Sequence, residues 1–215
     1  MKKQVWETGF FYAFDQVEQE PFSNGYARVY YEISNMYGSN HAVRLMHLFH
    51  LHLRKKYGLK MKPFLFGFSR GGLYAFNYAL CYPEYVEKLY LDVPVLNLKS
   101  WPPCNSKEHA ELLKEYLLNE ETFKEYAFSP IDRLEEFSKN RLPVLIVVGD
   151  ADAVVPHVEN CKIMVDYYHL RGLKIGYILE TRLRASPTFI AGRNADCRVY
   201  SVLIGYIVCK LKICI

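Results

Sequence analysis

A serine between two glycines is the residue of this sequence best suited to covalent chemistry. Residues 67–71 read Gly-Phe-Ser-Arg-Gly, which is the G-x-S-x-G spacing. An apolar run precedes the motif and a helical pattern follows it, so the motif predicts a sharp strand-to-helix turn that exposes Ser69. A serine in that position can attack a carbonyl group as a nucleophile. The alternative is a serine that only caps the helix in a glycine-rich turn.

Two carboxylates follow a second buried run, "LPVLIVV", at residues 142–148. Asp150 and Asp152 come at its end, so they are expected at the same edge of the sheet as Ser69. Asp152 is the better candidate for an acid that orients a histidine, because it already lies in the loop. We expect Asp150, at the strand end, to accept hydrogen bonds from the backbone amides of the turn.

The histidine base that a serine nucleophile requires is not evident in this sequence. His157 directly follows the acid loop and is a possible substitute base, although its connection is unfavourable for bridging Asp152 and Ser69. His47 and His50 share a helix face, but no carboxylate stands at a ligand spacing nearby, so we expect no metal site. The seven histidines of the chain are His41, His47, His50, His52, His109, His157 and His169.

The elements that must position these residues alternate between strands and helices. β-Branched, aromatic or continuous apolar runs predict strands at residues 27–34, 62–68, 86–95, 142–150 and 173–179. Helical periodicity predicts helices at 40–57, 71–82 and 158–172, with two or three short ones between 107 and 140. We expect His109 and His169 on helix surfaces. The alternation is typical of an α/β fold with a parallel sheet.

The composition restricts the class of protein. The chain has 215 residues, 51% of them hydrophobic, which is typical of one globular domain. The net charge of +4 is mild and no dense basic cluster indicates nucleic acid. The six cysteines form no C-x-x-C pair, which favours free thiols in a reducing compartment. Because we find neither a signal peptide nor a convincing membrane span, we expect a cytoplasmic protein without membrane partners.

Four stretches, in this order, resemble the α/β-hydrolase superfamily in its prolyl-oligopeptidase-like or carbohydrate-esterase-like branch. They are "MYGSNHAV", "GLKMKPFLFGFSRGGLYAFNYAL", "LYLDVPVLNLKSWP" and "LPVLIVVGDADAVVPHVEN". The resemblance implies a serine hydrolase of small or carbohydrate esters that needs no cofactor. It implies Ser69 as nucleophile, Asp152 as acid and a histidine after the last strand as base. It also places an oxyanion loop at "VWETGFF", where an amide from Thr8 or Gly9 would act with the Arg70 amide.

Both ends of the chain depart from the pattern of that family. The strands that normally precede the oxyanion loop are absent, so we expect residues 1–180 to form an incomplete hydrolase domain. Residues 181–215 hold no histidine where the family has its base. One permitted codon choice for Glu180 to Tyr200, read one base later, encodes a glycine and paired histidines. We therefore hypothesise a frameshift near residue 180 that leaves an aberrant tail, and the alternative to an active esterase is a catalytically inactive remnant.

Overall fold

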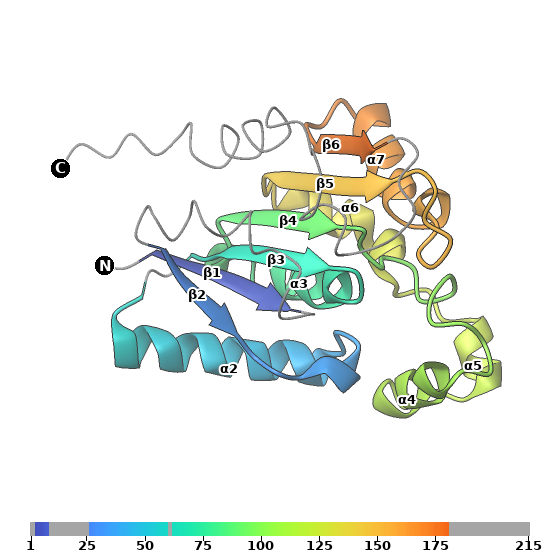
Figure 1. The fold of residues 1–215 in the computed structure, drawn as a ribbon, viewed down its shortest axis with the longest axis horizontal. Helices are drawn as coiled ribbons and strands as arrows, with labels where there is room; N and C mark the ends of the chain where they lie inside the picture. The colour runs from blue at the N-terminus through green and yellow to red at the C-terminus, as the bar shows by residue number, and fades with distance from the viewer. Residues whose placement is uncertain (1–2, 9–25, 60–61, 181–215) are drawn as a thin grey trace.

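Six strands form one parallel sheet in the computed structural model (Figure 1). The structure describes residues 3–8, 26–59 and 62–180. The strands lie in the order β2-β1-β3-β4-β5-β6, and every neighbouring pair is parallel. Their bounds are β1 Lys3–Thr8, β2 Tyr26–Tyr30, β3 Phe64–Phe68, β4 Lys88–Asp92, β5 Val144–Gly149 and β6 Gly176–Glu180.

The predicted α/β class and the five predicted strands are confirmed. β3 is buried at every position, and β5 at every position except Gly149, as expected of strands covered on both faces. β1 was not predicted, because the resemblance placed Val5 to Thr8 in a loop. That interpretation was wrong: β1 pairs with both β2 and β3, and this tertiary pairing outweighs the strand's polar composition.

The helices follow the predicted order. Ser39 caps the first of them, since its Oγ accepts from the Ala42 amide at 3.1 Å, and Gly58 ends it with a φ of +62°. The helices are α2 Asn40–Tyr57, α3 Gly71–Cys81, α4 Lys107–Glu115, α5 Glu120–Lys124, α6 Leu134–Lys139 and α7 Cys161–Leu170. Four 3-10 turns accompany them: η1 Ser34–Met36, η2 Pro83–Tyr85, η3 Pro130–Arg133 and η4 His157–Glu159.

A continuous apolar core joins α2, α3 and α7 to one face of the sheet. Leu65 of β3, Leu91 of β4 and Ile146 of β5 are buried and belong to this core, together with Phe76 of α3 and Met164 of α7. Each such side chain contributes roughly 1.5–3 kcal/mol of transfer free energy when it is removed from water. The core fixes α3, and hence the start of α3 where Ser69 lies, against the strands.

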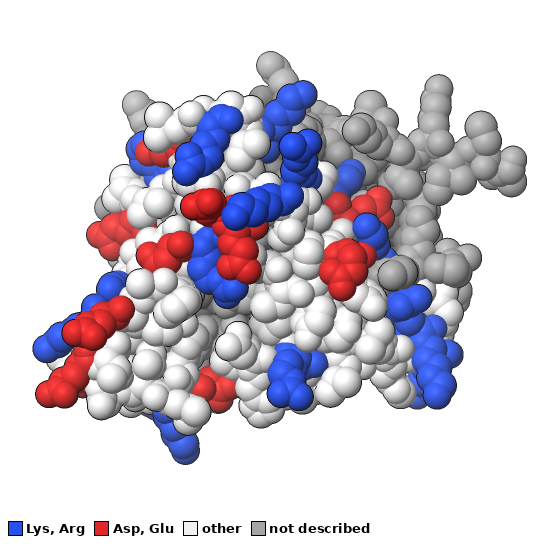
Figure 2. Space-filling view, turned by 180° about the vertical axis from the view of Figure 1, so that it is seen from behind, with Lys and Arg blue, Asp and Glu red and all other residues white. Residues whose placement is uncertain are grey.

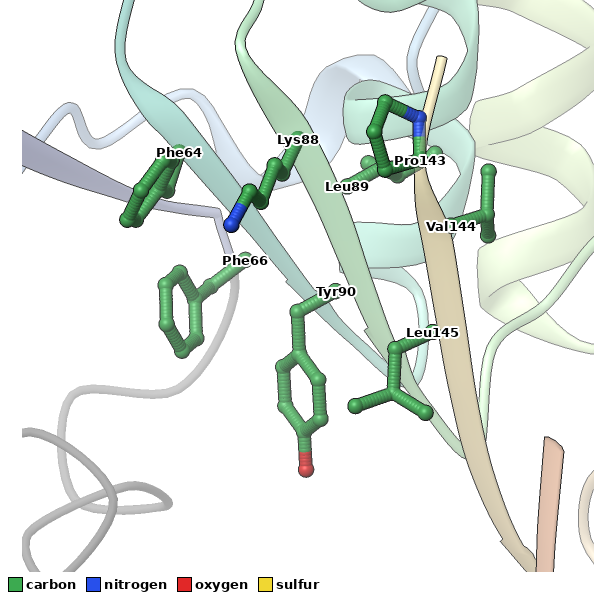
Figure 3. A pocket seen from close by; sticks show the side chains of 8 residues that line it. All are labelled: Phe64, Phe66, Lys88, Leu89, Tyr90, Pro143, Val144 and Leu145. Atoms are coloured by element: carbon green, nitrogen blue, oxygen red, sulfur yellow. The ribbon is translucent and has the colours of Figure 1, made fainter. Parts of the chain in front are cut away.

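The opposite face of the sheet carries the alternate strand positions. Figure 3 shows Phe66, Tyr90 and Leu145 projecting to the same side from β3, β4 and β5, and the Phe66 and Tyr90 ring centroids are 5.1 Å apart. The hollow that these residues line includes the first residues of all three strands. It therefore lies toward the amino ends of the strands, whereas Ser69 follows the carboxyl end of β3.

His109 is buried, so its predicted place on a helix surface was wrong. It is 2% exposed, and its ring meets that of Phe123 edge-on with 5.0 Å between centroids. Its Nε2 lies 3.2 Å from a carboxylate oxygen of Glu120. α4 packs on α5 at this point, and no periodicity within α4 alone reveals that contact. His169 is exposed, as predicted.

The surface seen from behind carries charges of both signs. Figure 2 shows Lys and Arg side chains interspersed with Asp and Glu over this face. None of the described helices combines the length and the apolar character that crossing a membrane requires. In the described residues the cysteines Cys81, Cys104 and Cys161 are free thiols, as the sequence predicted for them.

Candidate active site

Ser69 occupies the corner between β3 and α3. Its φ is +50°, in the left-handed region that non-glycine residues seldom adopt. Backbone hydrogen bonds hold the corner: the Ser69 N–H donates to the Asp92 carbonyl at 2.8 Å. The Ser69 carbonyl accepts from the amides of Gly72 and Val95 at 2.9 Å each. The strained conformation therefore persists because the end of β4 and the segment after it fix both sides of the serine.

Two glycines let the strand and the helix meet closely at this corner. A Cβ at Gly67 would lie 2.9 Å from the Gly71 carbonyl oxygen and 2.9 Å from the Ala75 Cβ. A Cβ at Gly72 would lie 2.6 Å from the Pro94 Cβ. Real Cβ atoms do not approach other heavy atoms so closely, so only glycine fits at both positions. Packing around the serine thus explains Gly67 of the motif and Gly72, which directly follows the motif.

The Ser69 side chain is half-buried, and its hydroxyl is available for a reaction. In the described part of the chain its Oγ accepts and donates no hydrogen bond, although its backbone groups do. The carboxyl ends of the parallel strands all point to this edge of the sheet (Figure 1). Ser69 therefore lies where open α/β sheets bind ligands, outside the carboxyl ends of the strands.

The Arg70 amide is the candidate donor for an oxyanion. Within the described residues its N–H has no acceptor, as expected in the first turn of a helix. Thr8 is the last residue of β1 and pairs in register with Gly67, so β1 brings the chain to the same edge. Gly9 lies outside the described residues. The structure thus brings Thr8, Ser69 and Arg70 to one edge of the sheet.

Asp152 is buried in the loop after β5, and it is 7% exposed. Its Oδ1 accepts from the amides of Val154 and Val155 at 2.8 and 2.9 Å. Asp152 thus holds the turn, a role that we also expect of Asp150, whose side chain is exposed. No described residue donates to Oδ2 of Asp152, which leaves that oxygen for a histidine.

No histidine in the described residues is hydrogen-bonded to Ser69 or to Asp152. His157 is the first residue of η4 and is half-buried. Its carbonyl accepts from the Asn160 amide at 3.3 Å and from the Cys161 thiol at 3.7 Å. The contacts of His157 thus come from its backbone. The predicted site residues share one sheet edge, but the structure joins His157 to none of them.

The histidine pair on α2 has a packing role. The Nδ1 atoms of His47 and His50 lie 3.3 and 2.8 Å from the Tyr78 hydroxyl, and His47 stacks on Tyr82 with 3.9 Å between ring centroids. Burial lowers the pKa of His47. Over residues 26–59 and 62–180, no three His, Cys, Asp or Glu side chains converge on a point that could hold a metal ion.

Asn160 positions the acid loop, a role that its place in the sequence does not predict. Its Oδ1 accepts from the amides of Leu96 and Asn97 at 2.9 Å each. Its Nδ2 donates to the Pro156 carbonyl at 3.0 Å and to the Ser100 hydroxyl at 3.1 Å. This fully buried amide thus ties the loop after β5 to the loop after β4. In a sequence, a single asparagine before a helix is interpreted as a helix cap. The hydrogen bonds from Asn160 to the loop after β4 are therefore not predicted.

Replacing Asn160 with alanine should lower the free energy of unfolding by about 2–4 kcal/mol, because buried amides lose their acceptor. Urea denaturation followed by circular dichroism measures the loss. Asn40→Ala is the matched control: Asn40 is exposed at the start of α2, so its effect should stay within about 0.5 kcal/mol. Equal losses for the two variants would contradict the bridging role of Asn160.

The comparisons with known proteins bear on the fold. No protein-family model and no curated protein matches the sequence. An α/β-hydrolase enzyme from a lagoon-sediment metagenome (Mar Chica, Morocco) superposes with a TM-score of 0.58 at 16% identity, over 94% of this chain and 91% of its own. The chain has the α/β-hydrolase fold. Its strand order, its crossovers and the corner at Ser69 are those of this fold.

Other proteins with the α/β-hydrolase fold cover this chain to a similar extent. An S-formylglutathione hydrolase from Agrobacterium tumefaciens has a TM-score of 0.63 at 16% identity, over 95% of this chain and 83% of its own. Dipeptidyl peptidase 4 from Porphyromonas gingivalis has a TM-score of 0.68 at 14% identity, over 96% of this chain. The chain spans only 31% of the length of that peptidase. These hydrolases share the architecture described above and differ in what they cleave.

Proposed function

We propose that this chain is a serine hydrolase that cleaves a small or carbohydrate acyl ester. Ser69 Oγ attacks the ester carbonyl, and the Arg70 amide, with an amide of the Thr8–Gly9 segment, stabilises the oxyanion that forms. The alcohol leaves, and an acyl-serine remains until water attacks it and releases the acid. The mechanism requires a histidine, oriented by Oδ2 of Asp152, that takes the Ser69 proton and passes it to the leaving alcohol, and no histidine of the described residues is hydrogen-bonded to either side chain. The reaction needs no organic cofactor.

The observation that carries this proposal is the conformation of Ser69. A φ of +50° at a non-glycine residue costs about 1–3 kcal/mol. A serine that only capped α3 would not need this conformation, because helix-capping residues ordinarily adopt extended φ and ψ. Ser69 lies at the carboxyl edge of the sheet, and within the described residues the next amide, that of Arg70, has no acceptor. Both features serve attack on a carbonyl group, and neither is required for packing.

Removing the Ser69 hydroxyl tests the proposal. We expect a fluorophosphonate probe to label the wild-type chain and to leave Ser69→Ala unlabelled, because labelling requires an activated serine. Turnover of 4-nitrophenyl acetate should fall about 100-fold or more in the same variant. Ser138→Ala is the matched control, since Ser138 lies in α6 and its hydroxyl donates to the Glu135 carbonyl. Equal labelling of all three proteins would refute a role for Ser69 as nucleophile.

A second candidate function is that of a catalytically inactive relative. The observation that favours it is the free Oδ2 of Asp152, to which no histidine of the described residues donates. The hypothesis of a frameshift near residue 180 concerns residues 181–215, which lie outside the described residues. Nucleotide sequencing tests it directly: a shifted frame that encodes paired histidines supports it, and the absence of such a frame disproves it.

A further inference from the structure

The Arg70 side chain is a cation that lies beside the candidate nucleophile. It follows Ser69 directly and is half-buried. In the described part of the chain no carboxylate forms an ion pair with it, whereas Arg133 pairs with Glu136 at 3.0 Å. A partly desolvated guanidinium normally has an anionic or hydrogen-bonding partner. This one has five N–H donors, and within the described residues none of them has an acceptor.

An aromatic ring holds the guanidinium in place without neutralising it. The guanidinium carbon of Arg70 lies 5.5 Å from the ring centroid of Tyr37, which is fully buried. The Tyr37 hydroxyl donates to Glu111 at 2.8 Å, so the ring is fixed from its other end. Burial and that hydrogen bond raise the pKa of the Tyr37 phenol, so the ring stays neutral at physiological pH. Burial likewise raises the pKa of Tyr74 to about 12.

The nearest carboxylate in this network already has partners. Glu111 accepts from Tyr37 and lies 3.5 Å from Lys107 Nζ. Glu111 belongs to α4, and Figure 1 shows α4 beyond the arrowheads of the strands. The Arg70 guanidinium, which contacts the ring that Glu111 holds, therefore lies on the carboxyl side of the sheet, between the Ser69 corner and α4. Substrate must approach Ser69 from that side.

We propose that the Arg70 guanidinium recognises a free carboxylate on the substrate, so that the site selects esters whose acid portion carries a second, unesterified carboxylate. The inference rests on the proposed serine hydrolase and adds a substrate class to it. A guanidinium matches a carboxylate with two parallel N–H···O bonds, and half-burial strengthens the pair relative to one in water. The ring of Tyr37 reduces the entropy lost on binding, because it restricts the guanidinium beforehand.

Binding to the Ser69→Ala variant tests the recognition without turnover. Monomethyl succinate carries one free carboxylate, whereas in dimethyl succinate both carboxylates are esterified and the molecule is neutral. Ligand-observed NMR gives the dissociation constant of each ester. We expect monomethyl succinate to bind about 10-fold to 100-fold more tightly, as for hydrogen bonds to a charged group. The preference should fall below about 3-fold in Ser69→Ala with Arg70→Gln, and Arg70→Lys should retain an intermediate preference because it lacks the planar fork.

A second arginine provides the matched control. The Arg171 guanidinium also lies over a tyrosine ring, 4.3 Å from the centroid of Tyr167, but it follows the last turn of α7. α7 runs back across the sheet from the carboxyl end of β5, so Arg171 lies toward the opposite edge from Ser69. Arg171→Gln should leave the ratio of the two dissociation constants unchanged. A loss of preference there would mean that any surface arginine suffices, and it would overturn the proposal.

The remaining outcomes separate this inference from the proposed function. Equal affinity for the two esters in Ser69→Ala overturns the carboxylate site, whatever the wild-type chain hydrolyses. An Arg70→Gln change that weakens both esters equally also overturns it, because the guanidinium would then serve the oxyanion or the fold. A preference that depends on Arg70, in a chain that no fluorophosphonate labels, refutes the serine hydrolase and leaves the carboxylate site standing.

Discussion

Alanine at Gly38 should lower the free energy of unfolding by about 3–5 kcal/mol, the largest stability effect that we expect. Gly38 has a φ of +68°, and a Cβ there would lie 2.7 Å from the Leu73 carbonyl carbon and 2.8 Å from its oxygen. Both atoms belong to the backbone of α3, so no side chain can move aside. Either α3 shifts, or the segment before α2 does. Urea denaturation gives the change in unfolding free energy.

Gly58→Ala separates the steric clash from the backbone strain. Gly58 has a similar φ of +62°, but no heavy atom lies within 4 Å of the position that its Cβ would take. Alanine at Gly58 should therefore cost only the strain of the left-handed conformation, about 1 kcal/mol. If the two variants lost equal stability, contact between Gly38 and α3 would contribute nothing. A larger loss at Gly58 would contradict the packing described here.

Free imidazole should raise Ser69-dependent ester cleavage about 10-fold or more, which is the largest gain in activity that we expect. The site has a strained serine, an oxyanion donor in the Arg70 amide and an acid whose Oδ2 has no described donor. A diffusing imidazole can act as the base that no described residue supplies to Ser69, although it lacks the advantage of fixed orientation. Only the neutral form accepts a proton, so the rescued rate should increase from about pH 6 to about pH 8.

The rate of 4-nitrophenyl acetate hydrolysis against imidazole concentration measures the rescue. Imidazole itself cleaves this ester, so the rate with Ser69→Ala at each concentration is subtracted. An imidazole-dependent rate that is the same in both proteins rules out the rescue. A saturating curve for the wild-type chain alone indicates that imidazole binds near Asp152, and Asp152→Asn should then weaken its binding.

The sequence predicted those parts of the fold and site whose signals are local. The corner at Ser69 follows from a buried run, paired glycines and a helical period within 20 residues, and Gly58 ends α2 as predicted. β1 escaped prediction because its stability comes from pairing with β2 and β3. The burial of His109 depends on α5, and the hydrogen bonds from two amides to Asp152 Oδ1 depend on how the loop after β5 folds. Such facts arise from tertiary contacts that periodicity does not encode.

The hydrogen bonds of the Ser69 backbone have a consequence for how this site can evolve. All of those in the described residues go to the end of β4, to Val95 or within the first turn of α3, and none goes to the segment that holds α4 and α5. Among the described hydrogen bonds, that segment reaches Tyr37, the residue under Arg70, through the side chains of Glu111 and Tyr116. Insertions or substitutions there can reshape what enters the site without displacing the serine. The residues that hold the Ser69 backbone and the residues that shape the entrance to the site therefore belong to different segments. The reactivity of the serine and the selectivity for substrates can change independently.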